Sequence, residues 1–289
     1  MLILRTNKLT SKINKFQLYS QIMANSRIIV LGTVSDIAVL DHNRTCAGTI
    51  LDVDGNQILI DPGIGTIIRA SQANIDLKRT NILLITSTES VYCNDINAVI
   101  EHTKDIHMIC PKELLKHDES ILTINHAKNL KTLALDKEEN KQTNIKNIEI
   151  QAYYNKSDAV SYKITTSKYV IGYITKAKYN KTFVDSFKDS NILIINLTKN
   201  EKNSKYLDFE EITELIREVS PELVILNGFN KKIIDTDPLE NARKIKQELQ
   251  KDKEQPIKTQ ILPAKEMMIL NPEAYNIKLK QKNLKGFFN

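Results

Sequence analysis

The chain has 289 residues, of which 41% are hydrophobic and 26% are charged, a balance that is ordinary for a globular protein with a sizeable core. Lys and Arg number 41 against 35 Asp and Glu, and the resulting charge of +6 permits an anionic partner without demanding one. The three cysteines are far apart and form no CxxC pair, so the sequence indicates neither a zinc ribbon nor a disulfide framework, and no apolar run approaches the roughly 20 residues of a membrane span.

The N-terminal 35 residues contain no Asp or Glu but several Lys and Arg. An acid-poor basic leader of this kind is typical of an organellar transit peptide. The alternative is an over-extended start, because Met23 lies just before the first convincing strand. We favour the second interpretation. It places residues 1–25 outside the core and predicts a cytoplasmic protein, with an organellar location as the alternative.

The first half of the chain alternates between strand and helix patterns. Strands are predicted at residues 27–32, 46–54, 57–61, 81–86 and 106–110, and helices at 66–72, at 94–102 with Asn94 or Asp95 as cap, and after Pro111. The pair Asp54-Gly55 predicts a hairpin turn, since glycine accepts a positive φ. Residues 137–147 are polar without periodicity and are predicted to be an exposed loop.

The second half repeats this plan. Strands are predicted at residues 148–153, 159–165, 169–174, 191–197, 223–226 and 257–262, helices at 181–187, 209–219 and 239–249, and a polar loop at 200–205.

Each half thus opens with antiparallel hairpins and continues with buried strands that alternate with helices. Two such halves, packed sheet on sheet with helices outside, predict an α/β fold, a four-layer αββα sandwich with two internally similar halves. A single doubly wound sheet is the competing interpretation, and the opening hairpins argue against it. We expect one domain over residues 26–270, followed by a Lys-rich tail at 271–289 that is a solvated end.

Three segments resemble metallo-β-lactamase-fold hydrolases: RIIVLGT, CAGTILDVDGNQILIDPGIGT and NILLITSTESVYCNDINAVIEH. In that family one strand ends in Asp-x-Gly, and the next apolar strand ends in Thr-His-x-His-x-Asp-His. Here residues 58–63 match the first element and residues 81–86 match the strand before the second. The resemblance covers residues 27 to about 270 and rests mainly on the spacing of the scaffold.

The metal-ligand positions of the family are all changed in this sequence. Ser87 and Glu89 stand where the first two histidines of the motif are expected, Val91 replaces the Asp, and Tyr92 replaces the third His. The later positions that the resemblance assigns to metal ligands hold Asn155, in a segment without His, and Lys176 and Gly228 at two strand ends.

These replacements matter because zinc in such sites needs imidazole or carboxylate ligands, typically three or more from the protein. Ser, Val and Gly cannot supply them, and a lysine repels a dication. The sequence therefore predicts a degenerate cleft with no metal, no cofactor and no confidently assigned catalytic residue.

Asp61, Glu89 and Lys176 are the charged residues of the degenerate cleft. An Asp before Pro-Gly more often orders a turn than acts in catalysis, and we favour that structural role for Asp61. One hypothesis is that the Lys176 ammonium fills the volume vacated by metal and pairs with Glu89 or Asp61. The alternative is that Lys176 and Glu89 are both exposed at the cleft mouth.

Cys93 follows the degenerate motif, but no nearby His could activate it as a nucleophile, so a small buried hydrophobe is the favoured interpretation. The sequence has neither GxGxxG nor GxxxxGK[ST], and a nucleotide site therefore has no support.

Three functions follow from this sequence. The favoured one is a pseudoenzyme, a binding or scaffold subunit whose partner is an active homologue or a second copy. The resemblance supports it, because such families contain inactive members that pair with active relatives, notably among RNA-processing nucleases. One alternative is a hydrolase of the phosphodiesterase, nuclease or thioesterase class with a rearranged or metal-free site at Asp61, Glu89, Tyr92 and Lys176. The other is a nucleic-acid binder. None of the three involves a membrane.

Overall fold

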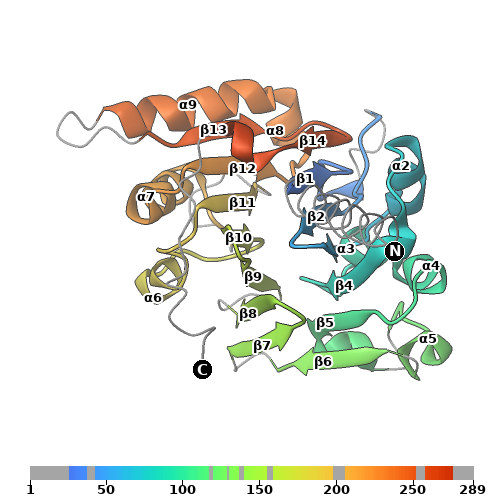
Figure 1. The fold of residues 1–289 in the computed structure, drawn as a ribbon. Coiled ribbons are helices and arrows are strands. Elements are labelled where there is room, and N and C mark those ends of the chain that lie inside the picture. The colour runs from blue at the N-terminus through green and yellow to red at the C-terminus, as the bar shows by residue number, and fades with distance from the viewer. Residues whose placement is uncertain are drawn as a thin grey trace, which may run out of the picture.

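Two seven-stranded sheets form the centre of the computed structural model, and helices lie outside them on both sides (Figure 1). The structure describes residues 26–37, 43–116, 120–128, 130–136, 140–154, 159–197, 206–251 and 258–275. The expected N-terminal extension, the loop at 200–205 and most of the Lys-rich tail lie outside the described residues. The αββα architecture expected from the sequence is confirmed.

The first sheet has the order β14-β1-β2-β3-β4-β5-β6. Pairing is antiparallel from β14 to β3 and parallel from β3 to β6. Its strands are β1 (Arg27–Val30), β2 (Thr49–Val53), β3 (Asn56–Ile60), β4 (Thr80–Leu84), β5 (His107–Pro111), β6 (Lys131–Leu135) and β14 (Met268–Leu270).

The second sheet has the order β13-β12-β11-β10-β9-β8-β7. It repeats the first, with antiparallel pairing from β7 to β10 and parallel pairing from β10 to β13. Its strands are β7 (Lys141–Ile145), β8 (Ile148–Tyr154), β9 (Val160–Thr165), β10 (Val170–Ile174), β11 (Ile192–Asn196), β12 (Leu223–Asn227) and β13 (Gln260–Pro263). The shared pattern of pairing is what makes the two halves similar.

Helices cover the outer face of each sheet (Figure 1). The helices of the first half are α2 (Thr66–Gln72), α3 (Ser90–Cys93), α4 (Ile96–His102) and α5 (Ile124–Lys128), with 3₁₀ turns η2 (Leu77–Arg79) and η3 (Lys112–Leu115). The second half contributes α6 (Lys181–Asp185), α7 (Phe209–Val219), α8 (Lys231–Asp235), α9 (Pro238–Gln250) and η4 (Pro272–Tyr275). Among the described residues no helix is long and apolar enough to cross a membrane.

The apolar strands β10, β11 and β12 are buried along their whole length, as their continuous apolar sequences predict. Tyr162 of β9 connects the two sheets, because its hydroxyl donates to the carbonyl oxygen of Ile85 at 2.6 Å. The predicted hairpin turn between β2 and β3 is also present, with positive φ at Asp54 (49°) and Gly55 (73°).

Two predictions about local structure were wrong. The polar stretch at 137–147 is not all loop, because β7 lies within it and pairs with β8 at the edge of the second sheet. Its side chains alternate between the exposed and the partly buried face, so polar residues are tolerated there. The side chain of Asp95 does not cap α4, and its carboxylate instead accepts from the backbone N–H of Ile67 at 3.2 Å.

Five further helices and strands were not predicted: α3, α5, β6, α8 and β14. All five are short, and periodicity needs a longer window than three to five residues. The pairing of β14 with β1 also joins residues 268–270 to residues 28–30, a connection that no local pattern contains.

Candidate functional site

The candidate site lies where strands of both sheets end. Asp61 directly follows β3, Lys176 lies two positions after the last residue of β10, and Gly228 directly follows β12. The loop after β1 closes the gap between the sheets, since Ser35 donates through Oγ to the carbonyl oxygen of Gly228 at 2.8 Å. The αββα fold thereby places cleft residues from distant parts of the sequence close together.

Asp61 is almost fully buried, at 3% exposure, and adopts a left-handed backbone with φ 53°. Its two carboxylate oxygens accept from the backbone N–H and the hydroxyl of Thr86, each at 2.7 Å. Burial raises the pKa of Asp61 to about 7, although the Thr86 bonds and the positive charge of Lys176 act to lower it. These bonds hold the loop after β4 against the loop after β3, a structural role that differs from the ordering of its own Pro-Gly turn expected from the sequence.

Lys176 also has a left-handed backbone, with φ 41°, and its side chain is only 8% exposed. The ammonium forms an ion pair with Glu89, whose side chain is 56% exposed. It also lies 4.8 Å from the ring centroid of Tyr92 and 5.9 Å from that of Tyr206. The pairing of Lys176 with Glu89 is therefore present, but only the carboxylate is at the exposed mouth of the cleft.

The remaining residues of the degenerate motif form the wall beside this pair. Ser87 is buried, and its hydroxyl accepts from the backbone N–H of Glu89 at 3.3 Å. Val91 and Tyr92 are buried in the short helix α3 and pack in one apolar cluster with Val34 and Cys46. Asn155 lies outside the described residues.

A small cavity lies between Asp61, Tyr92 and Gly228. Four further polar residues line it that the sequence analysis did not single out: Ser35, Tyr173, Asn196 and Asn227. Asn196 and Asn227 are the last residues of β11 and β12 and are directly paired. A polar residue at the end of each of two buried apolar strands is the signal that could have identified them.

The cysteines have no catalytic environment. Burial is the main reason that the pKa of Cys93 rises to about 12, and nearby Asp61 and Glu89 raise it further. Cys46 next to the cavity is similar, with burial raising its pKa to about 12. A thiol with such a pKa holds almost no thiolate at neutral pH. This agrees with the interpretation of Cys93 as a small buried hydrophobe.

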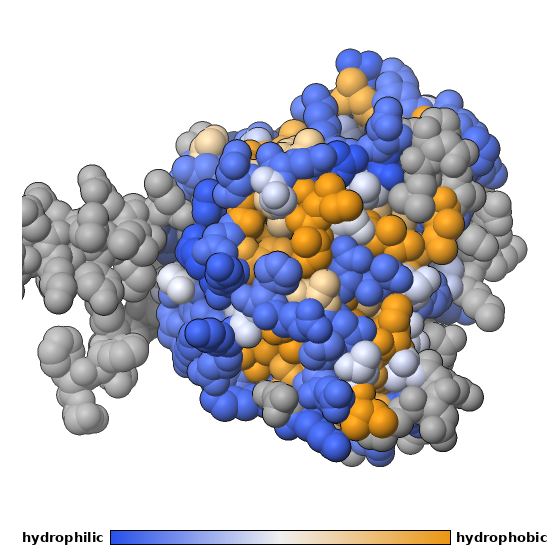
Figure 2. Space-filling model, turned by 90° about the vertical axis from the view of Figure 1, so that its right-hand side faces the viewer, coloured by the Kyte–Doolittle hydropathy of each residue, from blue (hydrophilic) through white to orange (hydrophobic). Residues whose placement is uncertain are grey.

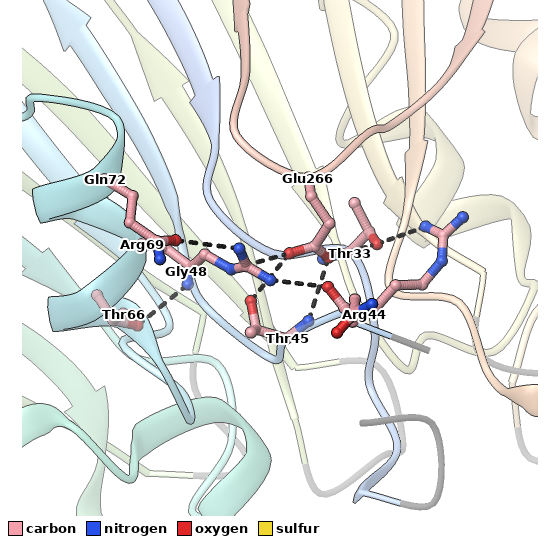
Figure 3. A network of polar contacts seen from close by, with 9 residues as sticks. Thr33, Arg44, Thr45, Gly48, Thr66, Arg69, Gln72 and Glu266 are labelled. Carbon is pink, nitrogen blue, oxygen red and sulfur yellow. Dashed lines mark hydrogen bonds and ion pairs between the residues drawn. The ribbon is translucent and has the colours of Figure 1, made fainter. Parts of the chain in front are cut away.

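A second polar network borders the cleft on the side of α2 (Figure 3). Glu266, between β13 and β14, accepts from the backbone N–H of Thr33 at 2.9 Å and of Thr45 at 3.2 Å, and also from both hydroxyls. Arg69 of α2 approaches the same carboxylate at 3.4 Å, and Arg44 donates to the Thr33 hydroxyl at 2.8 Å. Because these arginines are already bound to protein oxygens, the network serves to hold the loops of the cleft together.

Comparison with known proteins gives structural matches alone. No family model and no curated protein sequence matches the chain. The metallo-beta-lactamase fold protein YhfI from Bacillus subtilis matches with TM-score 0.67 and 12% identity, covering 85% of this chain and 99% of that one. The short form of human tRNase Z matches with TM-score 0.58 and 12% identity, over 85% of this chain and 98% of that one.

A long form RNase Z from yeast matches with TM-score 0.64 and 14% identity, over 90% of this chain and 42% of that one. At sequence identities of 12–14%, the structural likeness establishes the fold alone and not the function. The chain therefore has the metallo-β-lactamase fold, as the sequence resemblance implied.

The residues at the strand ends do not fit the metal that this fold implies. Lys176 brings an ammonium to the end of β10, while Val91 and Gly228 offer no donor side chain. Asp61 already has both carboxylate oxygens bonded to Thr86. Within the part of the chain that the structure describes, no group of three His, Cys, Asp or Glu could hold a metal ion.

Proposed function

We propose that this chain is a non-catalytic protein of the metallo-β-lactamase fold that acts as a binding or scaffold subunit. The observation that carries the proposal is the Lys176–Glu89 ion pair. It brings a buried positive charge to a strand end where the resemblance expects a bridging aspartate, and a lysine there is incompatible with a dication.

The same geometry weighs against metal-free hydrolysis. A general base must come within hydrogen-bond reach of a substrate proton. Asp61 is buried and bonded to Thr86, and the Lys176 ammonium is enclosed by Glu89 and two tyrosine rings. Burial also raises the pKa of Tyr92 well above its ordinary value, so its phenolate is not accessible as a base. We therefore prefer the scaffold role to the hydrolase and nucleic-acid alternatives.

A protein partner is supported by the surface over the first sheet. Figure 2 shows this face of the molecule, where hydrophobic areas lie between hydrophilic ones. Ile68 of α2 is 63% exposed and Ile124 of α5 is 46% exposed. Exposed apolar areas on a soluble protein are often sites of protein contact. We propose an active homologue of the same fold as the partner, with a second copy of this chain as the alternative.

The first test is the metal content of the full chain. The protein is loaded with excess Zn²⁺, Mn²⁺ or Fe²⁺, desalted and measured by mass spectrometry. We expect less than about 0.1 equivalent, because an intact site of this type retains zinc through such a treatment. A His126→Gln variant is the control for zinc bound at the surface, because His126 Nε2 lies 3.1 Å from Glu101 and the two side chains could hold a zinc ion together. Zinc that is lost in this variant was bound at the surface and not in the cleft.

One or two equivalents that persist in the control would overturn the proposal. Assays on phosphodiesters and thioesters would then be the next step.

If the metal is absent, the scaffold role predicts a stable complex with an active homologue, measured by size-exclusion chromatography with light scattering. Such a complex should weaken when Ile68 is changed to Glu, and should be unaffected by Lys131→Glu, a change of an exposed residue on the edge strand β6.

A further inference from the structure

The cavity among the strand ends has the size and the lining of a solvent site. Its volume is about 20 Å³, and its lining includes Asp61, Tyr92, Asn196 and Asn227. A cavity needs roughly 10–15 Å³ of such volume to hold one water molecule. The space is therefore large enough for one water molecule and too small for a substrate.

Three buried oxygen atoms of residues that line this cavity have no hydrogen-bond partner. Two are amide acceptors, Oδ1 of Asn196 and Oδ1 of Asn227, whose residues are only 7% and 5% exposed, and the third is the hydroxyl of Tyr92. The two asparagines are directly paired in register at the ends of β11 and β12. Buried acceptors are normally satisfied by protein or by ordered water, so two at one cavity indicate a ligand that donates hydrogen bonds.

The orientation of Asn196 is fixed by its own hydrogen bond. Its amide nitrogen donates to the hydroxyl of Thr175 at 3.1 Å, which leaves the amide oxygen pointing away from Thr175. The space beside this oxygen is kept open by Gly228, because a Cβ at that position would lie 3.0 Å from it. Gly228 also has a φ of 61°, which favours glycine. Gly228, at a position that the resemblance assigns to a metal ligand, thus keeps the cavity open.

We propose that this cavity binds one ordered water molecule, which donates its two hydrogens to Asn196 and Asn227. Tyr92 lines the same cavity and its buried hydroxyl has no hydrogen-bond partner, so this hydroxyl can donate the third hydrogen bond to the water oxygen. Three hydrogen bonds are typical of a buried water molecule.

Water fits this cavity better than a monovalent cation, which would also be attracted to amide oxygens. The Lys176 ammonium lies 4.8 Å from the ring centroid of Tyr92 and already supplies a positive charge to this region. A second cation next to it would be repelled, whereas water carries no charge. The proposal is independent of the scaffold role, since it concerns what replaced the metal centre and not what the surface binds.

The test is a crystal structure of the full wild-type chain, grown with sodium salts and then soaked in rubidium or thallium salts. We expect one density peak within about 2.5–3.0 Å of both amide oxygens, which is the range for an O–H donor and an oxygen acceptor, and no anomalous signal after soaking. An anomalous peak at this position would overturn the proposal in favour of a cation site. Absence of any peak would also overturn it.

A solution experiment gives a second readout. Asn227→Leu fills the cavity and removes one acceptor, so magnetic relaxation dispersion of water nuclei should count one fewer long-lived water molecule than in the wild type. The matched control is Asn241→Leu, because Asn241 is equally buried but has its side-chain amide bonded to Ile233, Thr236 and Asp237. An unchanged count in a folded Asn227→Leu protein, or an equal loss in the control, would contradict the proposal.

Discussion

Asp61 is the ionisable residue whose environment in the cleft has the clearest consequence for stability. An unfolded Asp titrates near 3.8, whereas burial raises the pKa of Asp61 in the folded chain to about 7. Between these values the folded state binds more protons than the unfolded state. The stability contributed by neutral Asp61 is therefore complete below about pH 3.8 and is lost as the pH rises through about 7.

Asp61→Asn imitates the neutral acid and can keep a hydrogen bond from the backbone N–H of Thr86. We expect the variant to gain stability relative to the wild type between pH 5 and pH 8, by on the order of 2–4 kcal/mol. Urea unfolding of both proteins at several pH values measures this difference. Two parallel curves of stability against pH would show that Asp61 is ionised throughout, and the argument from burial would fail.

The two partners of the central ion pair should respond differently to substitution. Glu89→Gln leaves a lysine with an 8% exposed side chain without its counter-charge, and we expect a loss of about 1–3 kcal/mol. Lys176→Met leaves a Glu89 that is 56% exposed and can be hydrated, so a loss under about 1 kcal/mol is expected.

Chemical denaturation of the two variants and of a matched surface control tests this order. The control is Asp105→Asn, since Asp105 and Lys131 form a pair in which both side chains are more than 60% exposed. Its expected effect is below about 0.5 kcal/mol. If Lys176→Met were the more damaging change, the lysine would be stabilised mainly by Asp61 and the tyrosine rings, and not by Glu89.

At the scale of elements, Glu266 links the connection between β13 and β14 by hydrogen bonds to two segments, one that follows β1 and one that precedes β2 (Figure 3). It receives hydrogen bonds from Thr33 and Thr45, and its side chain is 17% exposed. Glu266→Ala leaves two backbone N–H groups and Arg69 without this acceptor, so we expect a loss of about 2–4 kcal/mol.

Thermal and urea unfolding measure the loss, with Glu273→Ala as the control. Glu273 is 40% exposed and pairs with Lys168 at the surface, so its removal is expected to change stability by less than about 1 kcal/mol. Equal effects of the two changes would mean that the Glu266 network does not hold the loops in place.

At the scale of the whole molecule, the two halves are similar but not independent. One hydrophobic cluster contains Ile28 and Leu51 of the first sheet together with Tyr162 and Ile194 of the second. The first sheet also takes its edge strand β14 from the C-terminal part of the chain. A fragment that contains only the first half would therefore expose the inner face of its sheet to water.

We accordingly expect residues 26–136 to fail to fold alone, because burial of that face supplies much of the hydrophobic stabilisation. The measurement is the dispersion of amide resonances by NMR, with binding of a hydrophobic dye as a second readout. Dispersed resonances together with a cooperative unfolding transition would show that the first half is an autonomous domain.

The sequence by itself determined the class of fold and predicted that the positions assigned to metal ligands hold other residue types. The apolar strands β4, β11 and β12 are recognisable because burial on both faces demands a continuous apolar run. The Asp54-Gly55 turn is likewise local. That Val91 and Gly228 cannot bind a metal depends only on residue type.

Only the tertiary structure decided how the cleft residues meet. The pairing of Lys176 with Glu89 joins positions 87 residues apart, and their unequal exposure depends on packing from both sheets. The polar strand β7 is stable only because β8 lies beside it, and the cavity exists only because β11 and β12 end in register. A local sequence pattern predicts single helices and strands, because their periodicity lies within a few residues. Contacts between distant segments depend on how whole faces of the two sheets are buried against each other, and no local pattern contains that information.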